Sequence, residues 1–406
     1  MWNFIKWETL QFIGNKKNQA VYIILLLLSV YYAFAVAPTY EPVEKVSRDE
    51  MQAAYDTRAA FIESVEGREN LHPSVQFAAS LFPEWNKVEK RRIDALDEGD
   101  LLTYASSTAE WYTFTNELVI QYGDYFYYNP LYYTHGNSFA RDDGFYAYGY
   151  TASRYDHYSQ GNHDLSYELF EERTALQTVQ RLLNNFLPFV VLISCILLTA
   201  DIVLKDRRNP SIVKGFPISD WKRMFGKGFV AFVGSLVTVI PLSAGLLIIG
   251  LREGFGDFLL GVPIYNTDVS IFNYRPDLEI FSTIPMWEYL VKNIAFLSLW
   301  FIALIALIIL LSITLRLEFL NIAIGLGIVF AEFLYFERAV SPFTDAYWYP
   351  TSYVQVGQVI SGTRDFLYAS ELFTAERGVL LVAGSALLCI LLVLLITTNK
   401  RFSYTK

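Results

Sequence analysis

Six blocks of apolar residues, each about 17 to 25 residues long, constrain the fold of this sequence more than any other feature. A helix of about 20 residues is long enough to cross the hydrocarbon core of a bilayer. Within that core the backbone must satisfy its own hydrogen bonds, so such blocks fold as helices. We therefore expect an all-α integral membrane protein with spans at residues 19–37, 186–204, 225–250, 291–315, 319–336 and 378–397.

The lysine and arginine residues near these blocks predict the orientation. They gather before the first block, between the second and third, between the fourth and fifth, and after the sixth. With six spans all four segments lie on one side, which the positive-inside rule makes cytoplasmic. We expect a retained first span, both termini in the cytoplasm and a cytoplasmic tail at 398–406. The residues concerned are Lys6, Lys16, Lys17, Lys205, Arg207, Arg208, Lys214, Lys222, Arg223, Lys227, Arg316, Lys400, Arg401 and Lys406.

The opposite side then holds three segments, residues 38–185, 251–290 and 337–377. The first is long enough to form a large extracytoplasmic domain. It contains a capping box at Ser47 and Glu50, which predicts the start of a helix. Periodicity predicts further helices at 84–97 and 101–122, and a helix from about residue 165 that runs into the second span.

A tyrosine-rich stretch, residues 122–158, follows the predicted helices of this domain. Glycine, asparagine and aspartate are interleaved with the tyrosines, a pattern typical of loops or short strands. Clustered tyrosines suit the binding of a peptide, a sugar or a partner. The alternative, which we favour, is an aromatic core for a domain that has no disulfides.

Charge and cysteine content exclude two classes of protein. The net charge of −9 argues against a nucleic-acid partner, which requires a clustered basic surface. The two cysteines, Cys195 and Cys389, both lie in apolar blocks, so no disulfide framework is expected.

The N-terminal residues 1–18 are expected to form an amphipathic helix in the membrane interface. Aromatic and aliphatic residues alternate there with polar ones, and tryptophan favours that interface. The alternative is a short mobile tail. The residues predicted to contact lipid are Trp2, Ile5, Trp7 and Phe12.

The predicted inner loop, residues 205–224, carries apolar residues in addition to the positive charges that would anchor it on the cytoplasmic side. Phe216 and Ile218 flank Pro217, which favours a turn, and Ser219 is placed to cap a short helix that starts near Asp220. The charges alone indicate only a positive-inside anchor. An apolar tip beside a short helix, however, is suited to docking a partner protein.

At this point the sequence resembles a family. A basic loop reading Gly-Phe-Pro-Ile-Ser at residues 215–219, between the second and third of six spans, is similar to that of the permease subunits of bacterial type-2 ABC exporters. An amphipathic segment before the first span, a very short link between spans four and five, and the run Tyr-Pro-Thr-Ser-Tyr at 349–353 also match. Many members have a short link between spans one and two, whereas this chain has a whole domain there.

The resemblance implies a function and partners. An ABC ATPase subunit would dock on the loop, and a second permease subunit, the same or a different chain, would complete a dimer in the plasma membrane. Residues 337–377 would form re-entrant helices, and the cargo would be a peptide, lipid or drug moved outward. The docking residues so implied are Phe216, Pro217, Ile218, Asp220, Trp221, Lys222 and Arg223.

The chain has no nucleotide site of its own. No G-x-x-x-x-G-K-[ST] loop is present, so ATP and Mg²⁺ are expected on the partner subunit and no cofactor on this chain. The spans also hold almost no candidate nucleophile, base or metal ligand, which argues against a membrane-embedded enzyme. The other alternative is a membrane-anchored sensor whose outer domain binds a ligand.

Two further groups of polar residues are candidates for a site. The histidines lie in the outer domain, and His157, His163, Asp156 and Asp164 are of types that bind zinc, although their spacing matches no known ligand pattern; we expect no metal. Glu332 lies within the fifth predicted span and Asp201 near the inner end of the second. A carboxylate inside a span is a functional candidate by default, and Glu332 is the stronger of the two.

Overall fold

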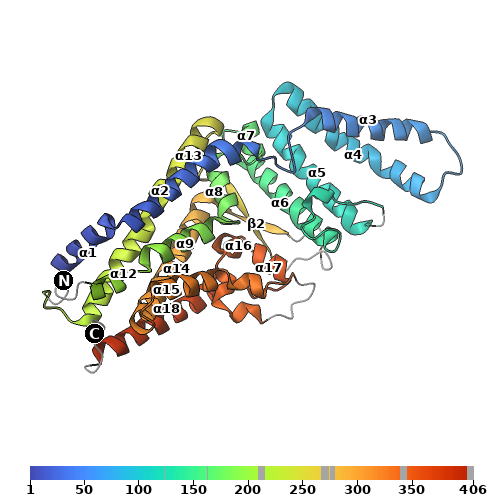
Figure 1. Cartoon of the computed structure of the whole chain (residues 1–406). Coiled ribbons are helices and arrows are strands. Elements are labelled where there is room, and N and C mark those ends of the chain that lie inside the picture. Colours follow the sequence, from blue (N-terminus) through green and yellow to red (C-terminus); the bar gives the residue numbers. More distant parts are fainter. Residues whose placement is uncertain are drawn as a thin grey trace. The chain divides into compact units, whose positions relative to one another are not determined.

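The computed structural model describes residues 1–123, 125–161, 163–208, 215–266, 274, 279–338 and 345–399 (Figure 1). The described chain divides into two compact units. Unit 1 consists of Met1–Thr39, Thr178–Phe255 and Tyr289–Lys406, and unit 2 of Tyr40–Gln177 and Gly256–Glu288. Lys214 and the terminal Lys400, Arg401 and Lys406, which we used to predict orientation, lie outside the described residues, as does most of the predicted tail.

Unit 1 is built from helices. Among the described residues, five stretches are long and apolar enough to cross a membrane, which makes this an integral membrane protein of mainly helical fold. They are Lys16–Thr39 (α2 Lys16–Tyr31 with the turns η1 Tyr32–Val36 and η2 Ala37–Thr39), Leu187–Asp206 (α9 Leu187–Thr199 and α10 Leu204–Arg208, which extends just past it), Asp220–Glu253 (α12 Asp220–Val237 and α13 Val239–Glu253), α14 (Met286–Thr314) and α18 (Ala375–Thr398).

These helices leave large apolar side chains uncovered by the rest of the chain. Ile240 is 68% exposed, Leu380 73% and Leu395 67%. In water such surfaces would be unfavourable, whereas in a bilayer the lipid tails cover them at no cost. The exposed apolar faces therefore agree with the lengths of the helices.

The segment predicted as the fifth span is shorter. Helix α15 (Glu318–Val329) has 12 residues, and the 3₁₀ turn η4 (Ala331–Leu334) follows it. At about 1.5 Å per residue, α15 alone rises only about 18 Å, less than the hydrocarbon core. A crossing at 319–336 remains a prediction.

Two predicted helices are interrupted. The third span breaks at Thr238 because Pro241 has no N–H for the carbonyl of Val237 and its ring crowds that turn. The prediction of one helix from residue 165 into the second span was wrong. The chain forms α7 (Tyr167–Phe170) and α8 (Ala175–Leu183), separated at Glu172, which has φ 54°, and a turn precedes α9.

The segment predicted to hold re-entrant helices contains four short helical elements in its described part. They are η5 (Ala346–Trp348), η6 (Pro350–Tyr353), α16 (Val356–Ile360) and α17 (Thr363–Tyr368). Gly362, with φ 71°, separates the last two.

Unit 2 begins with four helices that pack in sequence order, α3 (Arg48–Val65), α4 (Pro73–Glu98), α5 (Leu101–Gln121) and α6 (Ala140–Gln160). The short turn η3 (Pro130–Tyr132) lies between α5 and α6. The Ser47 hydroxyl accepts a 3.4 Å hydrogen bond from the Glu50 backbone N–H, so this half of the predicted capping box is present. Asp100 caps α5 in the same way.

The prediction of loops or strands at 122–158 was wrong for its second half, which is α6. Two of the glycines that suggested turns, Gly144 and Gly149, lie inside this helix, where they let aromatic rings approach its backbone. A Cβ atom at Gly144 would lie 2.0 Å from Cγ of Tyr128. The tyrosines supply the core, as we favoured: Tyr112, Tyr128 and Tyr148 are at least 95% buried and pack with Val119 and Phe145.

A two-stranded antiparallel sheet, which the sequence analysis did not predict, completes unit 2. Strands β1 (Gly261–Tyr265) and β2 (Phe281–Pro285) pair with Gly261 opposite Pro285 and Tyr265 opposite Phe281. Both pack on α6. Gly261 is required there, since a Cβ would lie 2.6 Å from the His157 ring. The segment 256–288 thus belongs to the same unit as 40–177.

We expect Gly144→Ala to destabilise unit 2. The added methyl group would overlap the Tyr128 ring in a packed core, and overpacking of this kind costs about 1–3 kcal/mol or more. Limited proteolysis of the purified protein should show faster cleavage in unit 2. Gly384→Ala is the matched control, because no atom lies within 4 Å of that Cβ position in α18; equal protection of the two variants would contradict the packing described here.

Candidate docking site

The predicted docking loop leads directly into α12. Ser219 occupies the N-cap position, but its side chain makes no capping hydrogen bond, and the helix begins at Asp220 as expected. The expectation of a separate short helix was wrong, because α12 continues without a break to Val237. The loop is therefore joined rigidly to the start of a long apolar helix.

Arg223 holds the loop against the first turn of α12. Its guanidinium donates to the backbone carbonyl of Phe216 (2.7 Å) and to the carboxylate of Asp220 (3.1 Å). The side chain is only 8% exposed, so both bonds are shielded from water. Arg223 is thus a structural residue, not a contact surface.

Phe216 also turns inward. Its ring lies 5.5 Å from that of Phe4 and 5.3 Å from that of Trp7, both on α1 (Trp2–Gly14). The contact with Phe4 is edge-to-face, a geometry that contributes about 0.5–1.5 kcal/mol beyond burial, and the contact with Trp7 is tilted. Of the seven predicted docking residues, Pro217, Trp221 and Lys222 are exposed, Ile218 and Asp220 are half-buried, and Phe216 and Arg223 hold the loop in place.

Helix α1 forms as predicted, but it packs on α12 instead of presenting only a lipid-facing surface. Two glycines of α12 receive aromatic side chains of α1. A Cβ at Gly226 would lie 3.1 Å from the Phe4 ring, and one at Gly234 would lie 2.4 Å from the Phe12 ring. Phe4 and Phe12 are eight positions apart, and so are Gly226 and Gly234. The two helices therefore run parallel, with matched spacing of these contacts.

The predicted interfacial residues divide accordingly. Trp2 is 74% exposed and remains available to lipid, Ile5 and Trp7 are half-buried, and Phe12 is buried. The sequence signal that would have revealed this packing is the equal spacing of the two aromatic residues and the two glycines.

A buried ionic cluster lies between the two glycine contacts. The Lys227 ammonium group is fully buried and donates to the carboxylates of Glu8 (2.9 Å) and Asp206 (3.0 Å) and to the carbonyl of Ile202 (2.9 Å). Lys205 pairs with the other oxygen of Glu8. Two lysines balance two carboxylates, and all three donors of Lys227 have an acceptor.

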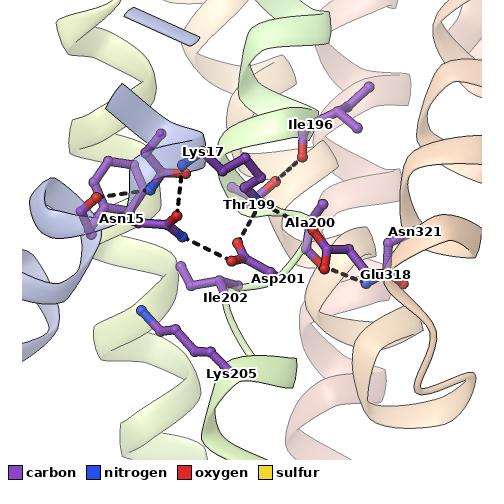
Figure 2. Close-up of polar contacts among 12 residues, drawn as sticks. Asn15, Lys17, Ile196, Thr199, Ala200, Asp201, Ile202, Lys205, Glu318 and Asn321 are labelled. Carbon is purple, nitrogen blue, oxygen red and sulfur yellow. Dashed lines mark hydrogen bonds and ion pairs between the residues drawn. The ribbon is translucent and has the colours of Figure 1, made fainter. Parts of the chain in front are cut away.

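A second polar layer joins the start of α2 to the end of α9 (Figure 2). Asp201 accepts from Lys17 (2.5 Å) and Asn15 (2.9 Å), and the Asn15 side chain in turn caps α2 through the Lys17 N–H. Lys17 also lies 3.5 Å from Glu318, at the start of α15. These contacts give Asp201 a structural role.

Asn321 extends this layer to α14. Its amide donates to the carbonyl of Ala200 (2.8 Å), as Figure 2 shows. It also donates to the hydroxyl of Ser312 (2.7 Å). The loop, α1, α2, α9, α12 and α15 are consequently connected at one end of unit 1 by polar contacts, which are buried around Lys227 and partly exposed around Lys17.

Comparisons with known protein families, with curated proteins and with solved structures found no match. The function must therefore be argued from the geometry of this chain.

Glu332 has a partner that the sequence did not reveal. The carboxylate, 4% exposed, forms a two-pronged ion pair with Arg364 of α17, in which one N–O distance is 2.8 Å, and accepts from Tyr368 (3.1 Å). No spacing rule links residues 32 positions apart. The arrangement joins η4 to α17, which is a structural role for this carboxylate.

The histidines of unit 2 approach each other without forming a metal site. The rings of His157 and His163 lie 5.4 Å apart, and His163 contacts Asp257 (2.7 Å). Hydrogen bonds from the Leu259 backbone N–H, which has the larger effect, and from His163 hold the pKa of Asp257 below its usual range. Across the described residues, no group of three or more His, Cys, Asp or Glu side chains is placed to hold a metal ion.

We expect Lys227→Met to destabilise unit 1 strongly. It would leave Glu8 and Asp206 buried with one lysine between them, and loss of one partner from a buried ionic cluster costs about 3–5 kcal/mol. Thermal unfolding of the detergent-solubilised protein measures the effect. Lys6→Met, at an exposed position of α1, should change the unfolding temperature little. Equal unfolding temperatures would show that the cluster does not stabilise the fold.

Proposed function

We propose that this chain is the membrane subunit of an ATP-driven exporter in a bacterial plasma membrane. ATP and Mg²⁺ would bind to a separate ATPase subunit, and a second permease subunit would complete the transport path. Unit 2 would face outward, both termini would be cytoplasmic, and α15 with η4 would form the fifth of six spans. The observation that carries the proposal is the anchored loop before α12.

The loop has the form of a docking surface because some of its residues are held in place and others are accessible. Phe216 and Arg223 hold it on α1 and α12, whereas Pro217 is exposed and Ile218 is half-exposed. An exposed apolar tip that is already ordered binds a partner at a low entropic cost. The placement of this loop among the basic segments favours the cytoplasmic side.

The anchoring contacts supply a mechanism for coupling. A displacement of the loop by a closing ATPase would pass through the bond from Arg223 to the Phe216 carbonyl into α12. Helix α1 would move with it, because Lys227 joins the two helices and the glycine contacts interlock them. A rigid element of this kind is what a shift between inward and outward access requires. The resemblance to the exporter family implies an amphipathic or apolar cargo, such as a peptide, a lipid or a drug.

We expect Ile218→Asp to abolish recruitment of the ATPase. The charged side chain would be buried unpaired in the interface, which is strongly unfavourable. The measurement is purification of the tagged chain from its own host in mild detergent, with assay of ATPase activity in the purified material. Wild type should bring an ATPase with it, and the variant should lose most of that activity.

Leu102→Asp is the control for this substitution. Leu102 is 51% exposed on α5 in unit 2, so the same chemical change there should leave the ATPase bound. If Ile218→Asp retained the ATPase at the level of wild type, the loop would not be the docking site; if wild type brought none, the exporter proposal itself would fail.

A second function, ligand sensing by unit 2, is favoured by a separate observation. Unit 2 contains a cleft of about 840 Å³, which is within the size range of small-ligand sites. Aromatic and acidic side chains line it, and among the described residues that line it none is lysine or arginine. The acidic ones are Glu84, Glu110, Glu117, Asp156 and Glu279. Such a cleft suits a cationic ligand.

If unit 2 is a sensor for cations, the double variant Glu84→Gln, Glu117→Gln should bind a short lysine-rich peptide about tenfold more weakly than wild type. Isothermal titration calorimetry at low salt measures this, because salt screens such contacts. Glu98→Gln, at an exposed position at the end of α4, is the control. Unchanged affinity of the double variant would exclude the cleft as the binding site.

A further inference from the structure

Unit 1 has an apolar groove of about 500 Å³ beside the docking loop, and Trp221, one of the predicted docking residues, lines one end of it. Helices α12, α14 and α18 form its walls. The side chains that define it include Phe225 and Phe229 from α12, Ile305 and Ile309 from α14, and Val393 and Leu394 from α18. Phe225 is 65% exposed and Phe229 47%, so the chain itself does not cover this surface.

The groove begins at one end of the helices and runs inward. Trp221, in the first turn of α12, lines it, as do Ile309 and Leu394, near the last residues of α14 and α18. Along α12 it reaches Phe232, a rise of about 16 Å at 1.5 Å per residue. That is about half of the thickness of the hydrocarbon core, or one leaflet.

Gly228 keeps the middle of the groove open. A Cβ at this position would lie 3.5 Å from Ile309 and 3.8 Å from Ile305, which is ordinary contact, so a larger side chain there would fill the space. The middle of the groove is therefore open only because residue 228 is glycine and has no side chain.

The end of the groove is positively charged and amphipathic. Lys222 is exposed, its ammonium nitrogen lies 5.4 Å from the centre of the Trp221 ring, and it makes no ion pair within the described chain. The neighbouring Asp220 is neutralised by Arg223. Tryptophan and lysine at the end of a membrane helix lie at the level of lipid head groups.

We propose that this groove binds one anionic phospholipid. An acyl chain would lie between α12, α14 and α18, the Trp221 ring would lie at the level of the glycerol, and the phosphate would lie beside Lys222. The charge of Lys222 selects an anionic head group over a zwitterionic one. Trp221 and Lys222 also belong to the predicted docking residues, but lipid binding in the groove does not require that the chain transports a cargo.

Native mass spectrometry of the full chain in mild detergent tests the proposal. The delipidated protein would be mixed with phosphatidylglycerol or with phosphatidylcholine of identical acyl chains. Wild type should retain phosphatidylglycerol about fivefold better, the effect expected of one basic residue at the membrane surface. Lys222→Gln should lose this preference, and Lys6→Gln, at an exposed position of α1, should keep it.

Two variants test the groove itself from different walls. Gly228→Leu and Ile390→Phe should each abolish retention of both lipids, and Ile390 is 38% exposed, so its replacement should not disturb folding. Gly384→Leu, whose Cβ position in α18 has no neighbour within 4 Å, should bind as wild type. Equal retention of the two lipids by wild type, or full retention by both filled variants, would overturn the proposal.

A second copy of the chain is the competing occupant. The Phe229→Cys variant would detect a second copy. If a second copy covered the groove, the two introduced cysteines would lie within cross-linking distance. Efficient cross-linking of two copies that excludes phosphatidylglycerol would overturn lipid binding, whereas monomeric protein with bound lipid would support it.

Discussion

The ammonium group of Lys227 is the contact on which the organisation of unit 1 depends. It is fully buried and joins α1, through Glu8, to α12 and to the segment after α9, through Asp206 and Ile202. A charge of this kind is tolerated in a membrane protein only when every donor is satisfied. The packing of Phe4 and Phe12 over the two glycines places Glu8 where it meets that requirement.

This contact changes how the N-terminal helix is interpreted. A helix that lay in the interface by hydrophobicity alone would move independently of the spans. Here the carboxylate of Glu8 and the Phe216 ring link it to α12 and to the loop before it. The three elements therefore form one mechanical body, and any partner that contacts the loop acts on the whole of it.

Much of this was accessible from the sequence, and the limits have physical causes. Bilayer-length apolar blocks and the capping residue Ser47 act locally, so the long helices and several boundaries were predicted. The pairing of Glu332 with Arg364, or of Glu8 with Lys227, depends on tertiary packing, which no local pattern encodes. Helix α6 was missed because a glycine such as Gly144, read from the local sequence, indicates a turn. In the folded unit the same glycine allows the Tyr128 ring to pack closely against the helix. The docking residues were placed on one loop, but their orientation required the structure.

Unit 2 is built from two stretches of chain, Tyr40–Gln177 and Gly256–Glu288, with α8 to α13 between them. A ribosome therefore completes the first stretch long before it makes the hairpin that packs on α6. Until then Tyr146 and Tyr150 lack the Phe281 ring that later contacts them. Unit 2 can therefore complete its packing only after the intervening apolar helices have been synthesised, so the order of the segments in the chain determines the order in which the two units are completed.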